Sequence, residues 1–339
     1  MKRLLFFILL SAGSAFCQEP TPRSLGFQHT RIRYEKDTAD VLIYSKRGDE
    51  EVKKPLLFFC QGSMPQPLIK YDKDGAYGVF PFSPDSLATN YHLVIVGKPG
   101  VPLAGSREEL QPNFCYTDST GCDPVAFQQN NHLDFYVKRN LAIIKRLQQY
   151  SWVSKKELVV AGHSEGSSVA LGMAVASKKV TQLIYSGGNP AGRIVSMLSE
   201  AASSDEDDSR MQSYLQYWRE IVDNPQLDTA ALGDPFKTTW SFSQPLGEKF
   251  MRLKIPVYIT YGSKDWCAPF ILMLAADLVR TGKTHVEFHA YQGCEHNFFP
   301  MNADGSVNYE QFNWDKVAVD WEDWLLRQQV KVLLNNTPI

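Results

Sequence analysis

Residues 162–166 constrain the fold of this chain more than any other segment, because they read Gly-His-Ser-Glu-Gly between an apolar run and a run of small residues. The apolar residues 158–161 predict a buried strand, and the small residues 167–174 predict a helix. Gly-x-Ser-x-Gly in this context is typical of a strained turn that exposes the serine hydroxyl. A Cβ at either glycine would collide with the neighbouring strand and helix. The pattern predicts Ser164 as a nucleophile, with helix capping as the simpler alternative.

The rest of the chain alternates predicted strands with predicted helices. Apolar runs at residues 55–60, 91–96, 157–161, 181–186, 256–261 and 285–291 predict buried strands, and helical spacing is found at 132–150, 165–177, 269–280 and 314–334. Residues 30–35 and 40–45 alternate apolar with polar side chains, which predicts a half-exposed antiparallel start. This alternation predicts an α/β fold with a mostly parallel, doubly wound sheet of about eight strands.

Two further polar residues each follow a predicted buried strand. Asp265 comes just after 256–261, and His296 comes just after 285–291. Open parallel sheets collect functional residues at such strand ends. Asp265 could instead cap the helix at 269–280, and His296 could be a hydrogen-bonded loop histidine. We favour His296 over His285 and His289, because the latter two belong to the strand segment itself, where packing is the simpler role.

The motif and the order Ser164, Asp265, His296 resemble the α/β-hydrolase superfamily of serine hydrolases. The resemblance spans residues 30–330 and implies a catalytic triad. His296 would accept the proton of Ser164 as the hydroxyl attacks a carbonyl, and Asp265 would orient and stabilise the imidazole. His163, inside the turn, is expected to be structural.

The same resemblance implies two backbone donors for the oxyanion. One is the N–H of Glu165, directly after the nucleophile. The other would come from the turn after strand 55–60, where Gln61-Gly62-Ser63 resembles the family's His-Gly-x sequence, with glutamine in place of histidine. We assign this second donor to the Ser63 N–H, with the Met64 N–H as the neighbouring alternative. Whether the Glu165 carboxylate also touches substrate is left open.

Within this family we expect a carboxylesterase that works through an acyl-enzyme intermediate. A peptidase is the alternative, because Gly-His-Ser-Glu-Gly also resembles the turn in dipeptidyl- and acylaminoacyl-peptidase catalytic domains. Those enzymes usually carry a large N-terminal propeller, and little chain precedes the first core strands here. A binding protein that kept the scaffold without the activity is the rival from another class.

Composition and the absence of known motifs limit which kinds of molecule this protein is expected to bind. The chain has 35 Lys and Arg against 37 Asp and Glu, a net charge of −2, with no basic stripe that would indicate nucleic acid. It contains no Gly-rich phosphate loop, dinucleotide fingerprint or His-Glu-x-x-His motif, so we expect no cofactor and no metal. The expected partner is a small-molecule or peptide substrate, and the oligomeric state is left open.

The N-terminus has the pattern of a secretory signal peptide. Lys2 and Arg3 precede an apolar run at residues 4–10, and small residues follow up to Cys17. We expect cleavage after Cys17, a single mature domain over 18–339, and a periplasmic or extracellular location without stable membrane insertion. A lipoprotein anchored at Cys17 is the alternative, against which bulky Phe16 argues.

Five cysteines remain after the expected cleavage. Cys115 and Cys122 bracket a short polar loop that suggests a local disulfide, and Cys267 and Cys294 lie two residues from Asp265 and His296. Assembly of the triad would make a Cys267–Cys294 bridge possible and leave Cys60 as a buried thiol. The alternative is that all five are small core or loop residues.

Two long segments exceed what the core requires. Residues 97–131 are rich in Gly, Pro, Asn and Gln, and we expect this loop to wall the substrate site. Residues 189–250 lie where the resembled superfamily inserts lids, and we expect a small helical cap there. Ser204 would cap a helix over 205–222. The aromatic residues Tyr214, Tyr217, Trp218 and Trp240 would pack against the body or form a substrate platform.

Overall fold

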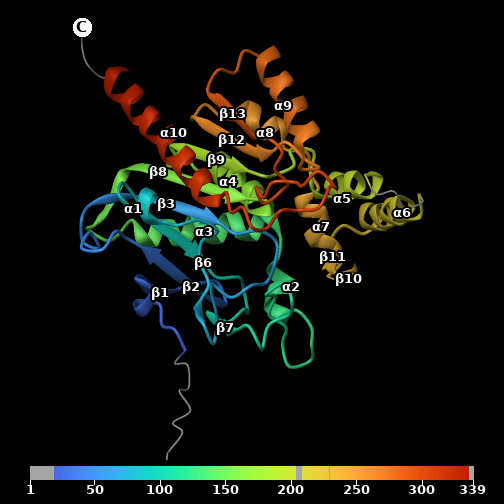
Figure 1. The fold of residues 1–339 in the computed structure, drawn as a ribbon, viewed down its shortest axis with the longest axis horizontal. Helices are drawn as coiled ribbons and strands as arrows, with labels where there is room; N and C mark the ends of the chain where they lie inside the picture. The colour runs from blue at the N-terminus through green and yellow to red at the C-terminus, as the bar shows by residue number, and fades with distance from the viewer. Residues whose placement is uncertain (1–18, 204–207, 229, 336–339) are drawn as a thin grey trace, which may run out of the picture.

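A computed structural model describes residues 19–203, 208–228 and 230–335, which are built around one eight-stranded sheet (Figure 1). In spatial order its strands are β1 (Phe27–Tyr34), β2 (Asp37–Tyr44), β6 (His92–Val96), β3 (Lys54–Cys60), β8 (Val153–His163), β9 (Gln182–Ser186), β12 (Val257–Gly262) and β13 (Val286–Tyr291). β2 runs antiparallel to both β1 and β6, and the remaining neighbours are parallel. This confirms the predicted mostly parallel sheet and its antiparallel start.

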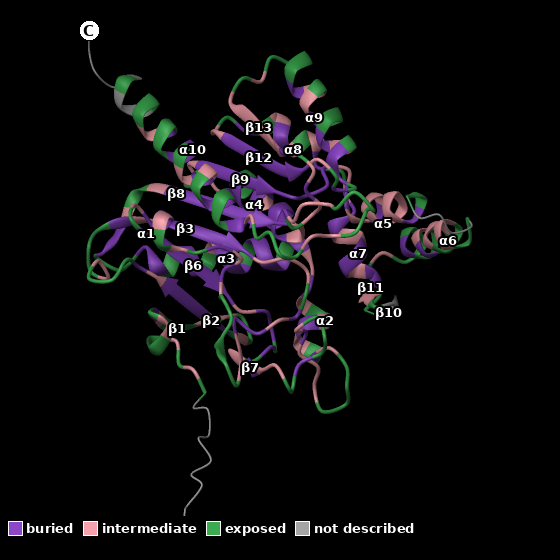
Figure 2. Ribbon diagram, viewed as in Figure 1, coloured by how far each residue is buried: buried purple, intermediate pink, exposed green. Residues whose placement is uncertain are grey.

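Helices cover both faces of the sheet. One face packs against α3 (Leu133–Leu147), α4 (Glu165–Ala176), α8 (Gly247–Arg252) and α9 (Ala268–Arg280), and the other against α1 (Asp85–Ala88) and α10 (Trp314–Asn335). Both faces of the central strands are therefore buried, which is why these strands read as continuous apolar runs (Figure 2). In β3, Phe58 contributes to the core beneath α3 and α4, and Phe59 to the core beneath α10.

The segment 97–131 does not form the wall that we expected. It contains β7 (Ala104–Ser106), which pairs with β4 (Ile69–Asp72) in a small sheet completed by β5 (Gly75–Ala76), and it ends with α2 (Val125–Asn130). A short 3₁₀ helix, η1 (Arg23–Leu25), precedes β1. Backbone hydrogen bonds of residues 103–107 are thus satisfied by β4 in the small sheet.

The segment 189–250, which we call the cap segment, gathers beyond one end of the sheet, on the right in Figure 1. It contains α5 (Arg193–Ala202), α6 (Ser209–Asp223), β10 (Ala230–Leu232), β11 (Asp234–Pro235), α7 (Phe236–Phe242) and the start of α8. Tyr217, Ile221 and Phe236 form a small core of their own, and Trp218 stacks on Trp240 at 5.6 Å. Ser204, which the sequence analysis predicted as a helix N-cap, lies outside the described residues. The division of the chain into leader, domain and cap stays a prediction.

The predicted disulfides Cys115–Cys122 and Cys267–Cys294 need correction. All five cysteines among the described residues, including buried Cys60, are free thiols. Cys115 is buried whereas Cys122 is exposed, and the turn between them is closed by the Asp118 N–H donating to the Cys122 carbonyl at 2.8 Å. The loops of Cys267 and Cys294 do adjoin, but hydrogen bonds join them.

None of the helices in the part of the chain that the structure describes is both long enough and apolar enough to span a bilayer.

Candidate active site

Ser164 sits on a strained turn between β8 and α4. Its backbone has φ 57° and ψ −129°, a region that residues with a Cβ rarely adopt, and its N–H donates to the Ser186 carbonyl at 2.9 Å. A Cβ built on Gly162 would lie 2.1 Å from the Gly166 carbonyl oxygen, and one on Gly166 would lie 2.1 Å from the Cys60 carbonyl oxygen. The backbone therefore approaches too closely for any residue but glycine at both positions. The turn contacts β3 through Gly166 and β9 through the Ser164 N–H.

Gly166→Ala is expected to destabilise the fold by about 3 kcal/mol or more, because the new methyl group meets rigid backbone atoms of β3 rather than a movable side chain. Urea unfolding followed by circular dichroism measures the change. Gly247→Ala is the matched control: a Cβ there meets no atom within 4 Å, so the expected change is within about 0.5 kcal/mol. Equal stabilities for the two variants would contradict the close approach at the turn.

Three side chains from distant segments form one hydrogen-bonded line. His296 Nε2 lies 2.9 Å from Ser164 Oγ, and His296 Nδ1 lies 2.7 Å from Asp265 Oδ2. These distances are those of a nucleophile, a base and an orienting carboxylate in hydrogen-bond contact. The structure thus brings together all three residues that the sequence singled out for the triad.

Backbone contacts between two strand-end loops position the carboxylate and the imidazole. Asp265 follows β12 and His296 follows β13, and these strands are parallel neighbours. The Lys264 N–H donates to the Cys294 carbonyl at 2.9 Å, and the Gly293 N–H donates to Ser263 Oγ at 2.8 Å. These hydrogen bonds do the joining that the sequence analysis assigned to a disulfide.

The local environment sets the charges of this pair. Burial alone would raise the pKa of Asp265, but the hydrogen bond and charge of His296 lower it below its usual value, helped by the Cys267 N–H, which donates to Asp265 Oδ1 at 3.0 Å. Burial alone would lower the pKa of His296, and the hydrogen bond and charge of Asp265 raise it above 6.5 instead. The imidazole is thus a stronger base than a buried histidine without that carboxylate.

His163 is buried beneath the triad. Its Nδ1 lies 3.1 Å from Ser186 Oγ, and its ring is 4.7 Å from the Trp314 ring and 5.0 Å from the His296 ring. Burial, with the charge of His296 adding to it, lowers the pKa of His163 to about 3. A neutral ring there adds no competing charge beside His296.

The two residues whose backbone N–H groups the sequence analysis assigned to an oxyanion site, Glu165 and Ser63, both lie beside Ser164. The Glu165 N–H is the first of α4, and Ser63 lines the same cavity as Ser164 and His296. A Cβ on Gly62 would lie 3.8 Å from the Ser164 Cβ, which places the turn 61–63 against the nucleophile. Neither N–H has an acceptor among the described residues, so both are available to a ligand.

The triad opens into a cavity of about 340 Å³, roughly the lower end of small-molecule sites. Its walls come from the triad loops and the cap segment, and none of its lining residues belongs to 97–131. Apolar surface is supplied by Met197, Tyr217, Phe242 and Trp266, and polar surface by side chains that include Ser168, Asn189, Arg193, Ser196, Glu200, Asp234 and Thr239. Tyr217 therefore both packs in the small core of the cap segment and lines the cavity.

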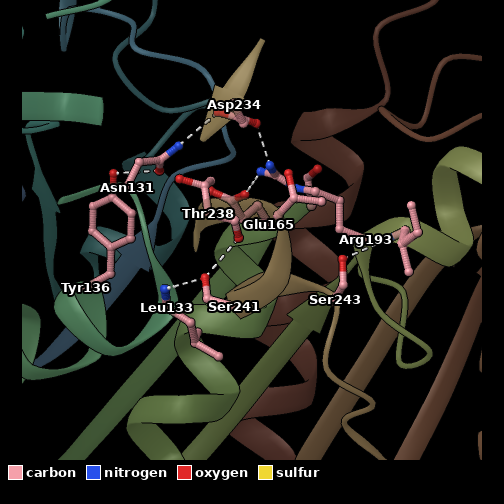
Figure 3. A network of polar contacts seen from close by, with 12 residues as sticks. Asn131, Leu133, Tyr136, Glu165, Arg193, Asp234, Thr238, Ser241 and Ser243 are labelled. Carbon is pink, nitrogen blue, oxygen red and sulfur yellow. Dashed lines mark hydrogen bonds and ion pairs between the residues drawn. The ribbon is translucent and has the colours of Figure 1, made fainter. Parts of the chain in front are cut away.

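A charged network links the nucleophile turn to the cap segment (Figure 3). Arg193 at the start of α5 lies between two carboxylates: its Nη2 pairs with Glu165 Oε2, and its Nη1 pairs with Asp234 Oδ2 at 2.5 Å. Asn131 Nδ2 donates to Asp234 Oδ1 at 3.3 Å, and Tyr136 donates to Asn131. The role of the Glu165 carboxylate was left open by the sequence analysis. In the structure this carboxylate forms an ion pair with Arg193 of the cap segment.

Sequence reasoning missed Arg193 and Asp234. Their partners lie 28 and 41 residues away in the chain, and neither residue belongs to a motif. The only available signal was the position of Arg193 after Pro190-Ala191-Gly192, where a helix could begin beyond a strand end.

No protein-family model and no curated protein matches the sequence, but solved structures do. Est1E from Butyrivibrio proteoclasticus, solved with ferulic acid bound, is 15% identical with a TM-score of 0.55, over 89% of this chain and 99% of that chain. Porphyromonas gingivalis dipeptidyl peptidase 4 is 15% identical with a TM-score of 0.54, over 89% of this chain and 35% of that one. Pyrococcus horikoshii acylaminoacyl peptidase is 16% identical with a TM-score of 0.51, over 80% and 37%.

These similarities and the strand order show that the chain has the α/β-hydrolase fold. It spans about a third of the length of the two peptidases and nearly all of the esterase. At such identities the likeness concerns the fold, and activity has to be argued from the site.

Proposed function

We propose that the protein is a serine hydrolase that cleaves a carboxylic ester through an acyl-enzyme intermediate. The observation that carries this proposal is the hydrogen-bonded line from Ser164 through His296 to Asp265, at 2.9 and 2.7 Å. A serine that merely capped α4 would need no imidazole at its hydroxyl, and its side chain makes no capping hydrogen bond.

In the proposed reaction Ser164 Oγ attacks the ester carbonyl as His296 Nε2 takes the hydroxyl proton. The oxyanion of the tetrahedral intermediate accepts hydrogen bonds from the Glu165 and Ser63 N–H groups. His296 then passes its proton to the departing alcohol, which leaves the acyl group on Ser164. Water, deprotonated by His296, attacks this acyl-enzyme and releases the acid. Throughout, the Asp265 carboxylate accepts a hydrogen bond from His296 Nδ1–H and stabilises the imidazolium.

Two observations support a short or polar ester over a long acyl chain. The cavity is small, and its wall carries charged and hydroxyl groups beside its aromatic residues. Burying a long alkyl chain against Arg193 and Asp234 would leave apolar surface facing charged groups that already pair with one another. Est1E, which binds ferulic acid, also matches over nearly its whole length, and this favours an ester substrate.

p-Nitrophenyl acetate and butyrate are expected to give kcat/KM values at least about 100-fold above that of the palmitate ester, because the charged and hydroxyl groups that line the cavity offer a sixteen-carbon chain little apolar surface to bury against. Initial rates of p-nitrophenol release across the series measure this. The Ser164→Ala variant corrects for background hydrolysis. A preference for the palmitate ester would contradict the cavity argument.

Peptidase activity is the second candidate, because the two peptidase catalytic domains share the fold. Aminoacyl- and dipeptidyl-p-nitroanilides assayed beside the esters separate the two. Turnover of anilides without turnover of esters would replace the esterase proposal, and turnover of neither by well-folded protein would favour a binding role on this scaffold.

We also propose that the protein is exported. The support is the sequence of residues 1–17, which lie outside the described part of the chain. N-terminal sequencing of protein made in a secretion-competent host is expected to begin at Gln18. Recovery of the whole product with Met1 or Lys2 at its start would contradict cleavage, and a diacylated Cys17 would establish the lipoprotein alternative.

A further inference from the structure

A second, smaller cavity lies behind the turn 61–63. Its volume is about 20 Å³, enough for roughly one water molecule or one ion of similar size. We call it the inner cavity, and its lining is Phe58, Phe59, Cys60, Gln61, Val96, Lys98, Tyr136, Arg139, Asn140 and Val169. It differs from the substrate cavity in every lining residue.

Two cationic side chains and two amides line the inner cavity, and the cations and the Asn140 amide have few acceptors to satisfy them. Lys98 and Arg139 are 7% and 2% exposed. Arg139 Nη1 donates to the Gly97 carbonyl at 3.1 Å, and its Nε donates to Asn140 Oδ1 at 3.4 Å. Asn140 Nδ2 meets only sulfur among the described residues, at 4.0 Å from Cys60 and 3.9 Å from Met173. Sulfur is a weak acceptor, so this donor is poorly satisfied.

The nearby carboxylates do not balance these charges. Among the described residues Arg139 has no carboxylate within 4.0 Å, and Asp37 acts on it only from farther away. Lys98 Nζ lies 3.9 Å from Glu165 Oε1, but that carboxylate already pairs with Arg193. The Tyr136 ring contacts both cations, at 4.5 Å from Lys98 Nζ and 5.1 Å from Arg139 Cζ, but it carries no net charge. Three cationic side chains, counting Arg193, therefore face two carboxylates, and buried excess charge is costly, which makes an anion the natural complement.

The titration of Lys98 agrees with this charge count. Burial, and then the positive charges of Arg139 and Arg193, lower the pKa of Lys98 to about 7. A bound anion would oppose all three effects. A water molecule could satisfy the N–H donors but would leave the excess positive charge in place.

We propose that the inner cavity binds one monovalent anion of chloride size, held between the Lys98 ammonium and the Arg139 guanidinium. The volume suits a single monatomic ion, and the aromatic and sulfur-bearing walls suit a large, weakly hydrated halide. Gln61 also lines the cavity and donates from Nε2 to the Val96 carbonyl. A bound anion would therefore stiffen the turn that presents the Ser63 N–H. This last consequence rests on the proposed function, whereas anion binding does not.

Thermal unfolding in sodium chloride and in sodium gluconate, at one pH and one ionic strength, tests the binding. Chloride is expected to raise the Tm by about 2 °C, because a ligand bound to the folded state alone stabilises it. The difference should vanish in Lys98→Met and persist in Lys331→Met, a control at an exposed lysine. Equal Tm values for the unaltered protein in the two salts would overturn the proposal.

Crystals of the unaltered protein grown in bromide without chloride give a second measurement, which does not require a variant to fold. An anomalous bromine peak between Lys98 and Arg139 is expected. Density without anomalous signal at that position would identify water and overturn the proposal. Neither measurement uses catalysis, so the anion site can fail or hold whatever the outcome of the ester assays.

Discussion

Ser164→Ala is expected to lower kcat for ester hydrolysis by about 10⁵- to 10⁶-fold, because it removes the atom that forms the acyl bond. His296→Ala should lose nearly as much, since the hydroxyl then has no acceptor for its proton. The two residues touch at 2.9 Å and act in one step. The double variant should therefore be little slower than either single variant. Steady-state rates on p-nitrophenyl acetate measure all three.

Ser177→Ala, at the other end of α4, is the matched control for the loss of a serine hydroxyl. Its kcat should stay within about twofold of the unaltered enzyme, because a surface substitution away from the site has little effect. Losses at Ser164 and His296 that multiply in the double variant would show that the two side chains act independently, and would contradict the hydrogen-bonded arrangement.

Asp265→Asn is expected to lower kcat by about 10³- to 10⁴-fold while leaving KM nearly unchanged. The amide keeps the shape of the carboxylate but cannot stabilise the imidazolium, and it favours the wrong imidazole tautomer. Asp277→Asn, in an exposed pair with Arg280, is the control and should keep full activity. A change confined to KM would assign Asp265 to substrate binding.

The pH profile gives this variant a second readout. The reaction needs neutral His296, so activity is lost as the pH falls through its pKa. In the unaltered enzyme that pKa is raised, and the acid limb of kcat/KM is expected above pH 6.5. Without the Asp265 charge, burial alone acts on the imidazole and lowers its pKa, so the residual activity should extend to lower pH. An unchanged acid limb would contradict the attribution of the shift to Asp265.

The sheet could be predicted because its physics is local in sequence. Strands buried on both faces need unbroken apolar runs, and the runs at 55–60 and 256–261 coincide with β3 and β12 within one residue at each end. The turn at Ser164 was equally readable, because close backbone approach requires Gly162 and Gly166. Because both residues follow parallel strands, the strand ends also predict that Asp265 and His296 lie near one another.

The cap segment could not be predicted in the same way, since its key contacts depend on tertiary structure. Arg193 pairs with Glu165 and Asp234, and no spacing or motif relates these three residues. The cysteine interpretation failed for a related reason. Adjacent loops made Cys267–Cys294 geometrically attractive, yet hydrogen bonds such as Lys264 N–H to the Cys294 carbonyl already join them. Proximity in a fold does not decide which chemistry joins two loops.

A fluorophosphonate probe, followed by peptide mass spectrometry, tests the central claim most directly because it reports the nucleophile itself. We expect a single adduct on Ser164 in the folded protein, slowed by orders of magnitude in His296→Ala. Folded protein that takes no label, or that carries it on another residue, would show that Ser164 is not an activated nucleophile.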